Sequence, residues 1–310
     1  MFSTPILFLV FNRLETTQKV FEQIRKIQPQ KLYLAADGPR KGIEEDQSKC
    51  TGVREFLANA IDWPCEVKTL FRDENLGCGI AVSQAITWFF EQEEMGIILE
   101  DDCLPDLSFF TFAQVLLNKY LHDDRIMVIS GNNFQDGHMR GNASYYFSRF
   151  PNIWGWATWR RAWKLYDFEM NGLDDFLQDS LFHSILQDEV QKTFWLKYLL
   201  NTRSGEMNTW DIQLAYCVWR NNGLSVSPNK NLVSNIGFAS KEATHTSGTS
   251  HLSNILLEKM GEMTHPTKVF PDRQADDYMF YHAYTNGRDS ILLRLKKIVH
   301  KICLKGFGIR

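Results

Sequence analysis

The sequence predicts an α/β protein built on a mostly parallel sheet with helices on both faces. Through residue 133, short apolar runs alternate with amphipathic stretches of helical period. Polar, charged or glycine residues follow the apolar runs, as they do where buried strands end. Apolar residues make up 44% of the 310 positions, which is enough for a substantial core. Strands separated by helices favour parallel pairing, because the helix carries the chain back to the edge where the strand began.

The first half of the chain divides into regular elements. The opening apolar run, residues 5–11, predicts a first buried strand. A helix over 14–27 follows, because apolar residues recur there at helical spacing. The same alternation continues with predicted strands over 31–36, 66–71, 96–99 and 125–130, and predicted helices over 50–61, 79–91 and 107–121.

The second half is less regular. Its most distinctive segment, residues 150–159, concentrates aromatic residues around a glycine. The patterns further on predict helices over 174–200 and 209–220, a strand over 225–233 and a mobile polar loop over 234–253. We therefore expect a nucleotide-sugar-binding α/β half over 1–133, an acceptor-binding and catalytic half of the same domain over 134–253, and a C-terminal extension over 254–310.

The extension ends in a predicted basic amphipathic helix over 291–310, in which isoleucine, leucine and valine alternate with lysine and arginine. Such a helix either lies on an anionic membrane surface or docks on the core through its apolar face. The apolar runs are all shorter than the roughly 20 residues that span a bilayer, and the opening run lacks a basic region and a cleavage site. We therefore expect a cytoplasmic protein, either free or peripheral at the inner membrane face.

The net charge and the cysteine spacing argue against two classes of function, nucleic-acid binding and a zinc ribbon. The net charge of −3 provides no global basic field, which argues against nucleic acid as a partner. The six cysteines are scattered and form no C-x-x-C pair, so we expect reduced structural thiols and no zinc ribbon.

Three consecutive carboxylates, Glu100, Asp101 and Asp102, follow the apolar strand that ends at Leu99. Like charges at the mouth of a buried strand repel one another and resist desolvation. The arrangement is therefore favourable if a cation sits there, and carboxylate oxygens suit Mg²⁺ or Mn²⁺. The alternative is a solvated acidic turn.

Ligands of parallel α/β sheets collect at the carboxyl ends of the strands. Polar, charged and glycine residues recur at each of these predicted ends, which makes them candidate ligand loops: 12–13, 37–38, 72–78, 100–102 and 131–133.

With these motifs in order, the chain resembles the nucleotide-diphospho-sugar glycosyltransferases of the GT-A fold. It is most similar to the inverting N-acetylglucosaminyltransferase that initiates complex N-glycans, and to its bacterial relatives. The resemblance runs from residue 5 to about residue 245, and its strongest signal is the E-D-D form of the family's acidic metal motif at 100–102. It implies a GT-A type, Rossmann-like sheet with an irregular acceptor-side half. It also implies a nucleotide-sugar donor (UDP-linked by preference), Mn²⁺ or Mg²⁺, and a glycan or lipid-linked saccharide acceptor.

The resemblance assigns roles on the donor side. Asp102 would bind the metal, with Glu100 and Asp101 near the ribose or the sugar. Arg13 would contact a phosphate or the base, and Asp37 would accept a hydrogen bond from the uracil imide. A surface salt bridge is the alternative for Arg13, and an ordinary turn residue is the alternative for Asp37.

Two further assignments concern loops. Asn75 and Gly77 belong to an R-D-E-N-L-G segment that, in similar transferases, lets the backbone approach the nucleotide. His245 is the candidate for a late histidine on the metal or the diphosphate, although a lone loop histidine is as often simply solvated.

The resemblance places a general base in a W-D pair at the start of a helix, which Trp210 and Asp211 match. Inverting transfer needs such a base to take the proton of the acceptor hydroxyl. Helix capping is the alternative for Asp211. The family carries a second acid next to this Asp, whereas this chain has Ile212.

The aromatic residues predict a sugar pocket. Trp154, Gly155 and Trp156 lie where the family has a glycine-aromatic segment that shapes the pocket, and Trp210 adds a further flat face. Core packing is the competing explanation, because tryptophan is buried on average.

Two other functions compete with transfer. A sugar nucleotidyltransferase would open with a glycine-rich G-x-G-T-R type loop, but residues 11–15 contain no glycine. A non-catalytic sugar- or metal-binding module is the other alternative. Neither the sugar, the nucleotide, the acceptor, the linkage nor the oligomeric state follows from the sequence.

Overall fold

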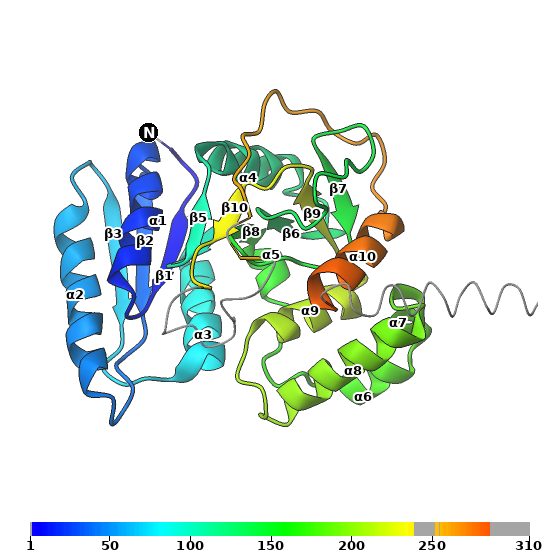
Figure 1. Cartoon of the computed structure of the whole chain (residues 1–310), viewed down its shortest axis with the longest axis horizontal. Helices are drawn as coiled ribbons and strands as arrows, with labels where there is room; N and C mark the ends of the chain where they lie inside the picture. Colours follow the sequence, from blue (N-terminus) through cyan, green and yellow to red (C-terminus); the bar gives the residue numbers. More distant parts are fainter. Residues whose placement is uncertain (1, 239–251, 254, 286–310) are drawn as a thin grey trace, which may run out of the picture.

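The structure is a computed structural model that describes residues 2–238, 252–253 and 255–285, and an eight-stranded sheet runs through it (Figure 1). The strand order is β3-β2-β1-β4-β8-β6-β9-β7, and β7 and β8 run against the other six. This confirms the predicted mostly parallel α/β sheet. The strands are β1 (Ile6–Val10), β2 (Lys31–Ala36), β3 (Glu66–Phe71), β4 (Met95–Glu100), β6 (Ile126–Ser130), β7 (Tyr145–Ser148), β8 (Trp156–Trp159) and β9 (Leu224–Pro228), with β5 (Cys103–Pro105) and β10 (Val233–Asn235) forming a separate antiparallel pair.

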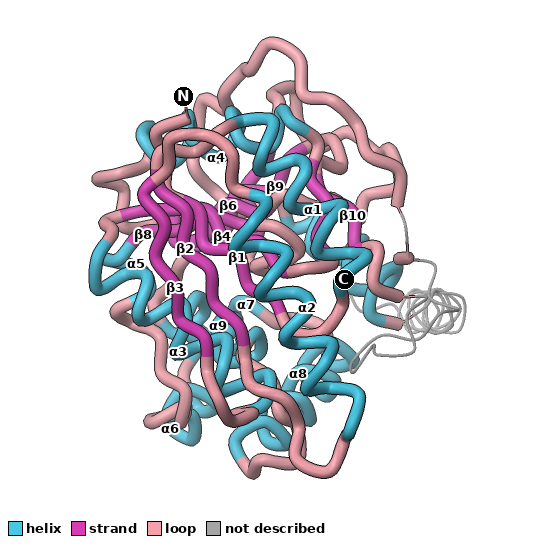
Figure 2. The backbone as a smooth tube through the Cα atoms, turned by 90° about the vertical axis from the view of Figure 1, so that its left-hand side faces the viewer, coloured by secondary structure: helices cyan, strands magenta, loops and turns pink. Residues whose placement is uncertain are grey.

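Helices cover both faces of the sheet (Figure 2). Alternate residues of β1 show why, because Ile6, Phe8 and Val10 pack towards α1, α2 and α4, whereas Leu7 and Leu9 pack towards α3 and α9. Both faces of the strand are thus apolar, as expected for a parallel sheet. The helices are α1 (Leu14–Ile27), α2 (Glu44–Ala60), α3 (Gly77–Gln92), α4 (Leu107–Lys119), α5 (Arg160–Trp163), α6 (Leu173–Gln178), α7 (Ser180–Ile185), α8 (Glu189–Arg203), α9 (Asp211–Arg220) and α10 (Arg273–Met279), which continues as a π-helical turn (Phe280–Tyr284).

Two predicted elements are wrong in their extent. The helix expected over 174–200 is three helices, because Asp179 and Asp188 accept hydrogen bonds from the backbone N–H groups of residues 181 and 190 and so begin new helices. The strand expected over 225–233 is divided between β9 in the large sheet and β10 in the small one. The predicted amphipathic helix over 291–310 lies outside the described residues, as does most of the predicted mobile loop. The first residues of that loop are regular, since β10 extends to Asn235.

Two further elements, one in each half of the chain, differ from the prediction. The helix expected over 50–61 begins at Glu44, where acidic residues in its first turn stabilise the positive end of the helix dipole. The aromatic segment was not expected to contain a strand, but it contributes β8, which lies between β4 and β6. Over the part of the chain that the structure describes, no helix combines the length and apolar character needed to cross a bilayer.

An ion pair with a buried carboxylate ties α2 to the end of β1. The Asp46 carboxylate accepts hydrogen bonds from Arg40 Nε at 2.6 Å and from Asn12 Nδ2 at 2.8 Å. Asp46 is 1% exposed, and the Arg40 hydrogen bonds outweigh burial and lower its pKa from 3.8 to about 2.

Asp46→Asn should therefore lower stability at neutral pH. Because the folded-state pKa lies below its ordinary value, the carboxylate stabilises the fold above about pH 4, and this contribution is lost as the pH falls towards 2. We expect a loss of about 1–2 kcal/mol at pH 7, reduced by the partial exposure of Arg40, and a smaller loss at pH 3. Urea unfolding at several pH values measures it. Asp62→Asn, which removes an exposed partner of Arg25, is the control, and an equal, pH-independent loss in both variants would contradict the assignment.

The strand order indicates which edge of the sheet is expected to bind ligands. The chain runs outward from β1 to β2 and β3 and then returns to the other side of β1 as β4. Loops therefore diverge at the carboxyl ends of β1 and β4, which are side by side because Leu9 pairs with Glu100. Such a switch point opens the crevice where α/β sheets bind their ligands.

Candidate functional site

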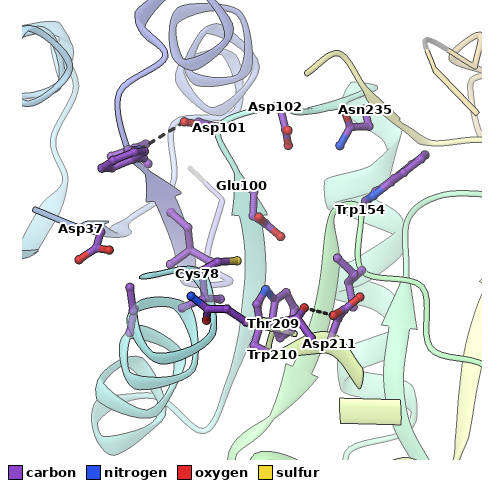
Figure 3. A pocket seen from close by; sticks show the side chains of 18 of the residues that line it. Asp37, Cys78, Glu100, Asp101, Asp102, Trp154, Thr209, Trp210, Asp211 and Asn235 are labelled. Carbon is purple, nitrogen blue, oxygen red and sulfur yellow. Dashed lines mark hydrogen bonds between the residues drawn. The ribbon is translucent and has the colours of Figure 1, made fainter. Parts of the chain in front are cut away.

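A cavity of about 850 Å³ lies at this edge of the sheet, and residues from both halves of the chain line it (Figure 3). The loops after β1, β2 and β4 form one side, and the segment before α9 and the stretch after β6 form the other. Ten of the residues singled out in the sequence line it: Arg13, Asp37, Asn75, Gly77, Glu100, Asp101, Asp102, Trp154, Trp210 and Asp211. His245 lies outside the described residues.

The acidic cluster, residues 100–102, lies against one guanidinium. Arg13 Nη1 is 2.8 Å from Asp102 Oδ2 and 3.6 Å from Asp101 Oδ1. Burial lowers the pKa of Arg13, but the charges of Asp101 and Asp102 outweigh it and the net pKa is raised. Burial raises the pKa of Asp101 to about 7 although Arg13 opposes this. The pKa of Glu100 is raised well above its ordinary value by burial and then by the charges of Asp102, Asp101 and Asp211.

These residues fit a divalent cation in charge and in ligand type. Three carboxylates face one guanidinium, and all of their donor atoms are oxygen, which suits Mg²⁺ or Mn²⁺. The side chains that the structure describes form no group of three or more His, Cys, Asp or Glu arranged to hold an ion. The donor set therefore suits an ion that one or two of these carboxylates would hold.

A backbone segment covers Asp102. The amide of Ile236 donates to the Asp102 carbonyl oxygen at 2.8 Å. A Cβ atom at Gly237 would lie 2.3 Å from Asp102 Oδ2, so only glycine lets the segment approach this closely. The antiparallel pairing of β5 with β10 brings it there. The segment is the described beginning of the stretch that leads to His245.

Asp37 anchors a loop at the end of β2. Its carboxylate accepts hydrogen bonds from the backbone N–H groups of Gly38 at 2.9 Å, Leu76 at 3.0 Å and Gly77 at 3.1 Å. Asn75 strengthens the connection, since its Nδ2 donates to the Gly38 carbonyl oxygen at 2.8 Å. Both side chains thus hold the start of α3 against β2 while they line the cavity. Their nucleotide contacts stay predictions.

The start of α3 also contacts the segment before α9. Gly77 has a left-handed φ of +77°, and a Cβ atom there would lie 2.5 Å from Asn208 Nδ2. Asn208 Oδ1 in turn accepts from the Gly79 amide at 2.9 Å. Asn208 was not recognised in the sequence, because its partners are 129 residues away and no local pattern marks it.

Asp211 is the first residue of α9, and its carboxylate lines the cavity opposite the acidic cluster (Figure 3). The Thr209 hydroxyl donates to Asp211 Oδ1. The carboxylate lies at the positive end of the α9 dipole. The charge of Asp211 contributes to the raised pKa of Glu100, so the two carboxylates are close enough to interact electrostatically across the cavity.

The aromatic residues divide between wall and core. Trp154 is partly exposed in the cavity, where its ring meets Phe134 and Phe238 edge-on at centroid distances of 5.0 and 5.4 Å. Trp156 is fully buried and stacks on Trp210 at 5.6 Å, which places Trp156 behind the wall.

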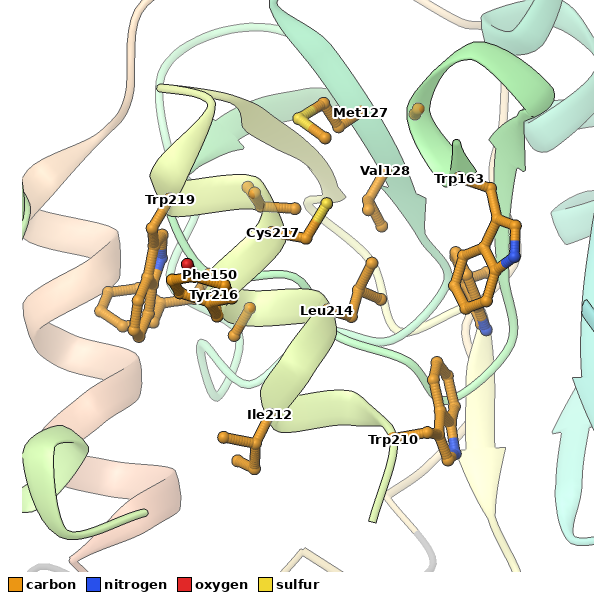
Figure 4. Close-up of a cluster of buried hydrophobic side chains, with 14 of the residues drawn as sticks. Met127, Val128, Phe150, Trp163, Trp210, Ile212, Leu214, Tyr216, Cys217 and Trp219 are labelled. Carbon is orange, nitrogen blue, oxygen red and sulfur yellow. The ribbon is translucent and has the colours of Figure 1, made fainter. Parts of the chain in front are cut away.

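Core packing, the competing explanation, therefore holds for part of the predicted sugar pocket. Gly155 also lies behind the wall, against Val233. Trp210 reaches the cavity from the edge of the apolar cluster that α9 buries (Figure 4).

No protein-family model matches the chain, and no curated protein matches its sequence. Solved structures give weak similarities. HddC from Yersinia pseudotuberculosis is 10% identical with a TM-score of 0.32, over 53% of this chain and 80% of that one. S. aureus TarS 1-349 is 10% identical with a TM-score of 0.36, over 54% of this chain and 50% of that one. The inositol-1-phosphate CTP transferase from T. maritima is 10% identical with a TM-score of 0.32, over 52% and 73%. Values this low show neither a shared family nor a shared function.

Proposed function

We propose that the protein is a metal-dependent glycosyltransferase that moves a sugar from a nucleotide-diphospho-sugar, preferably UDP-linked, to a glycan or lipid-linked saccharide. The observation that carries this proposal is the placement of an acidic cluster and a separate carboxylate, Asp211, on opposite sides of one large cavity. That cavity lies at the switch point of the sheet, where nucleotides bind in α/β folds.

In this proposal Asp102 holds Mn²⁺ or Mg²⁺, and His245 is a second ligand. When bound, the ion supplies positive charge that offsets the charge on the departing nucleoside diphosphate. Arg13, which is 2.8 Å from Asp102, contacts the phosphates, and Glu100 and Asp101 lie near the ribose or the sugar. Support comes from the excess of carboxylates over cations around Arg13.

The nucleotide would lie on the side of the cavity formed by the loops after β1 and β2. Arg13 begins the first of these, and Asp37 and Asn75 hold the second in place. Gly77 would meet the nucleotide through its backbone at the start of α3, and the space that a Cβ atom would fill there is occupied by Asn208. The apolar side chains of α3 that line the cavity provide a surface for a flat base.

Asp211 acts as the general base and takes the proton of the acceptor hydroxyl as its oxygen attacks the anomeric carbon. Direct displacement from the side opposite the diphosphate inverts the anomeric centre. The position of Asp211 across the cavity from the acidic cluster supports this division of roles. The exposed face of Trp154 offers a flat surface to a sugar ring.

The competing activity is nucleotidyl transfer, which forms the nucleotide-sugar. The absence of glycine from residues 11–15 argues against it, since the triphosphate loop of such enzymes needs a close backbone approach. Cytoplasmic location and peripheral membrane association through residues 291–310 stay predictions.

A screen of the wild-type protein tests the proposal. In the presence of Mn²⁺, UDP-sugars should raise the unfolding temperature more than GDP-, CMP- or dTDP-sugars do. A ligand that binds only the folded state stabilises it. The same mixtures should slowly release UDP and free sugar when no acceptor is present. Release of pyrophosphate from a nucleoside triphosphate and a sugar 1-phosphate would instead establish the nucleotidyltransferase. Absence of any stabilisation or hydrolysis would favour a non-catalytic module.

A further inference from the structure

Asn132 is a buried polar residue in the cavity wall whose side chain forms no hydrogen bond to any residue that the structure describes. It follows β6, is 1% exposed and lines the cavity. Within the described part of the chain, neither Nδ2 nor Oδ1 of Asn132 has a hydrogen-bond partner. Buried amides almost always form hydrogen bonds, because an unpaired buried amide loses its hydrogen bonds to water and gains none in the folded protein, which lowers the free energy of unfolding.

The neighbours of Asn132 are, by contrast, fully bonded. The Asn133 side chain donates to the Pro228 carbonyl oxygen at 2.6 Å and accepts from the Gln135 amide at 2.7 Å. On the other side, Gly131 donates to the Gly155 carbonyl oxygen at 2.7 Å. The backbone is therefore held on both sides of Asn132, and its unpaired amide does not reflect a loose segment.

The position of Asn132 relates it to the proposed donor site. Strands β4 and β6 run in the same direction with β8 between them, so their carboxyl ends lie on the same edge of the sheet. Two strand spacings separate these ends by about 10 Å. The acidic cluster follows β4, and Asn132 follows β6. If a diphosphate lies at the acidic cluster, the distance that remains between it and Asn132 is about the length of one sugar ring.

The chemistry of the amide defines what it would bind. A carboxamide presents one donor and one acceptor side by side and carries no charge. Its complement is a neutral donor–acceptor pair, which a sugar offers either as two adjacent hydroxyls or as an acetamido group. Asn132 lines the cavity, so its amide lies next to the space that a bound sugar would occupy.

We propose that Asn132 binds a neutral donor–acceptor pair on the transferred sugar and thereby selects the donor. This inference rests on the proposed function. It gives a role to an amide that has no partner among the described residues, in a wall that an apolar residue of similar size would fill. Sites that bind through hydrogen bonds discriminate strongly against substrates that cannot complete them.

The test compares Asn132→Leu with Asn133→Leu, a matched change at the next, fully bonded position. Asn132→Leu should leave the unfolding temperature unchanged or raise it, because it removes no bond of the free protein. Asn133→Leu should lower it or prevent folding. Calorimetry with Mn²⁺ should show UDP binding to Asn132→Leu within about twofold of wild type, and binding of the preferred UDP-sugar weakened by about tenfold or more. Asn132→Ala should give the same pattern.

The choice of donor separates the two sources of the donor–acceptor pair. If hydroxyls provide it, UDP-glucose and UDP-N-acetylglucosamine both lose affinity for Asn132→Leu, and if the acetamido group provides it, only the second does. Equal binding of these donors by wild type and variant would overturn the inference and leave the proposed function intact. Thermal destabilisation of Asn132→Leu comparable to that of Asn133→Leu would also overturn it, since the amide would then be bonded within the free protein. A wild-type protein that binds no nucleotide or nucleotide-sugar would refute the proposed function and the inference together.

Discussion

Replacing Asp211 by Asn should reduce sugar transfer by about 10²–10⁴-fold, the usual contribution of a positioned general base. An amide keeps the shape of the side chain and can still accept from the Thr209 hydroxyl, but it cannot take a proton from the acceptor. The start of α9 should therefore stay intact. Binding of UDP with Mn²⁺ should stay within about twofold of wild type, because Asp211 lies across the cavity from the acidic cluster.

The control for this variant is Asp188→Asn at the start of α8. The Asp188 carboxylate accepts a hydrogen bond from the Val190 amide at 2.8 Å. Its replacement therefore measures how much an Asp at the start of a helix contributes to stability when it has no catalytic role. It should alter stability slightly and turnover very little. Steady-state kinetics with a saturating nucleotide-sugar separate the two cases. Wild-type turnover in Asp211→Asn would remove it from the mechanism and leave the alternative of a residue that only stabilises its helix.

Asp102→Ala should weaken Mn²⁺-dependent UDP binding by at least about 100-fold, because charge compensation at a diphosphate is worth several kcal/mol. The change removes the carboxylate proposed to hold the ion and also frees Arg13 from its 2.8 Å contact. The Arg13 guanidinium keeps its 3.6 Å contact with Asp101 Oδ1 and can bind a phosphate in its own right. Titrations with and without Mn²⁺ therefore separate the two contributions: loss of the metal-dependent component supports the metal site, whereas a metal-dependent component as large as in wild type would refute it.

Asp106→Ala provides the matched control for the metal prediction. Asp106 is four positions further along the chain and caps α4, where it accepts from the Ser108 amide at 2.8 Å. Its loss should lower stability by about 1 kcal/mol, as for other N-caps. Metal-dependent UDP binding should be unaffected. If both variants lost binding equally, the acidic loop would have unfolded in each of them. The loss in Asp102→Ala would then contradict a specific role of Asp102 in holding the ion.

The first half of the sheet could be predicted because its elements are defined locally. Strands that are buried on both faces are continuous apolar runs, and helices that cover them have apolar residues at helical spacing. For α1, β2 and β3 the predicted and observed bounds agree. β8 could not be predicted in this way, since its neighbours β4 and β6 are distant in sequence and the glycine at its start resembles a turn.

Two features of the site could be predicted from local patterns: an apolar strand ends in Glu100, Asp101 and Asp102, and Asp211 begins a helix. Burial of a strand and the start of a helix depend on residues close in the chain. Other features became known from the folded chain alone: these carboxylates share one cavity, Asp37 holds the loop before α3, and Trp156 lies in the core. Those facts depend on the strand order, which brings together loops that are distant in the chain, and strand order is set by packing between distant segments.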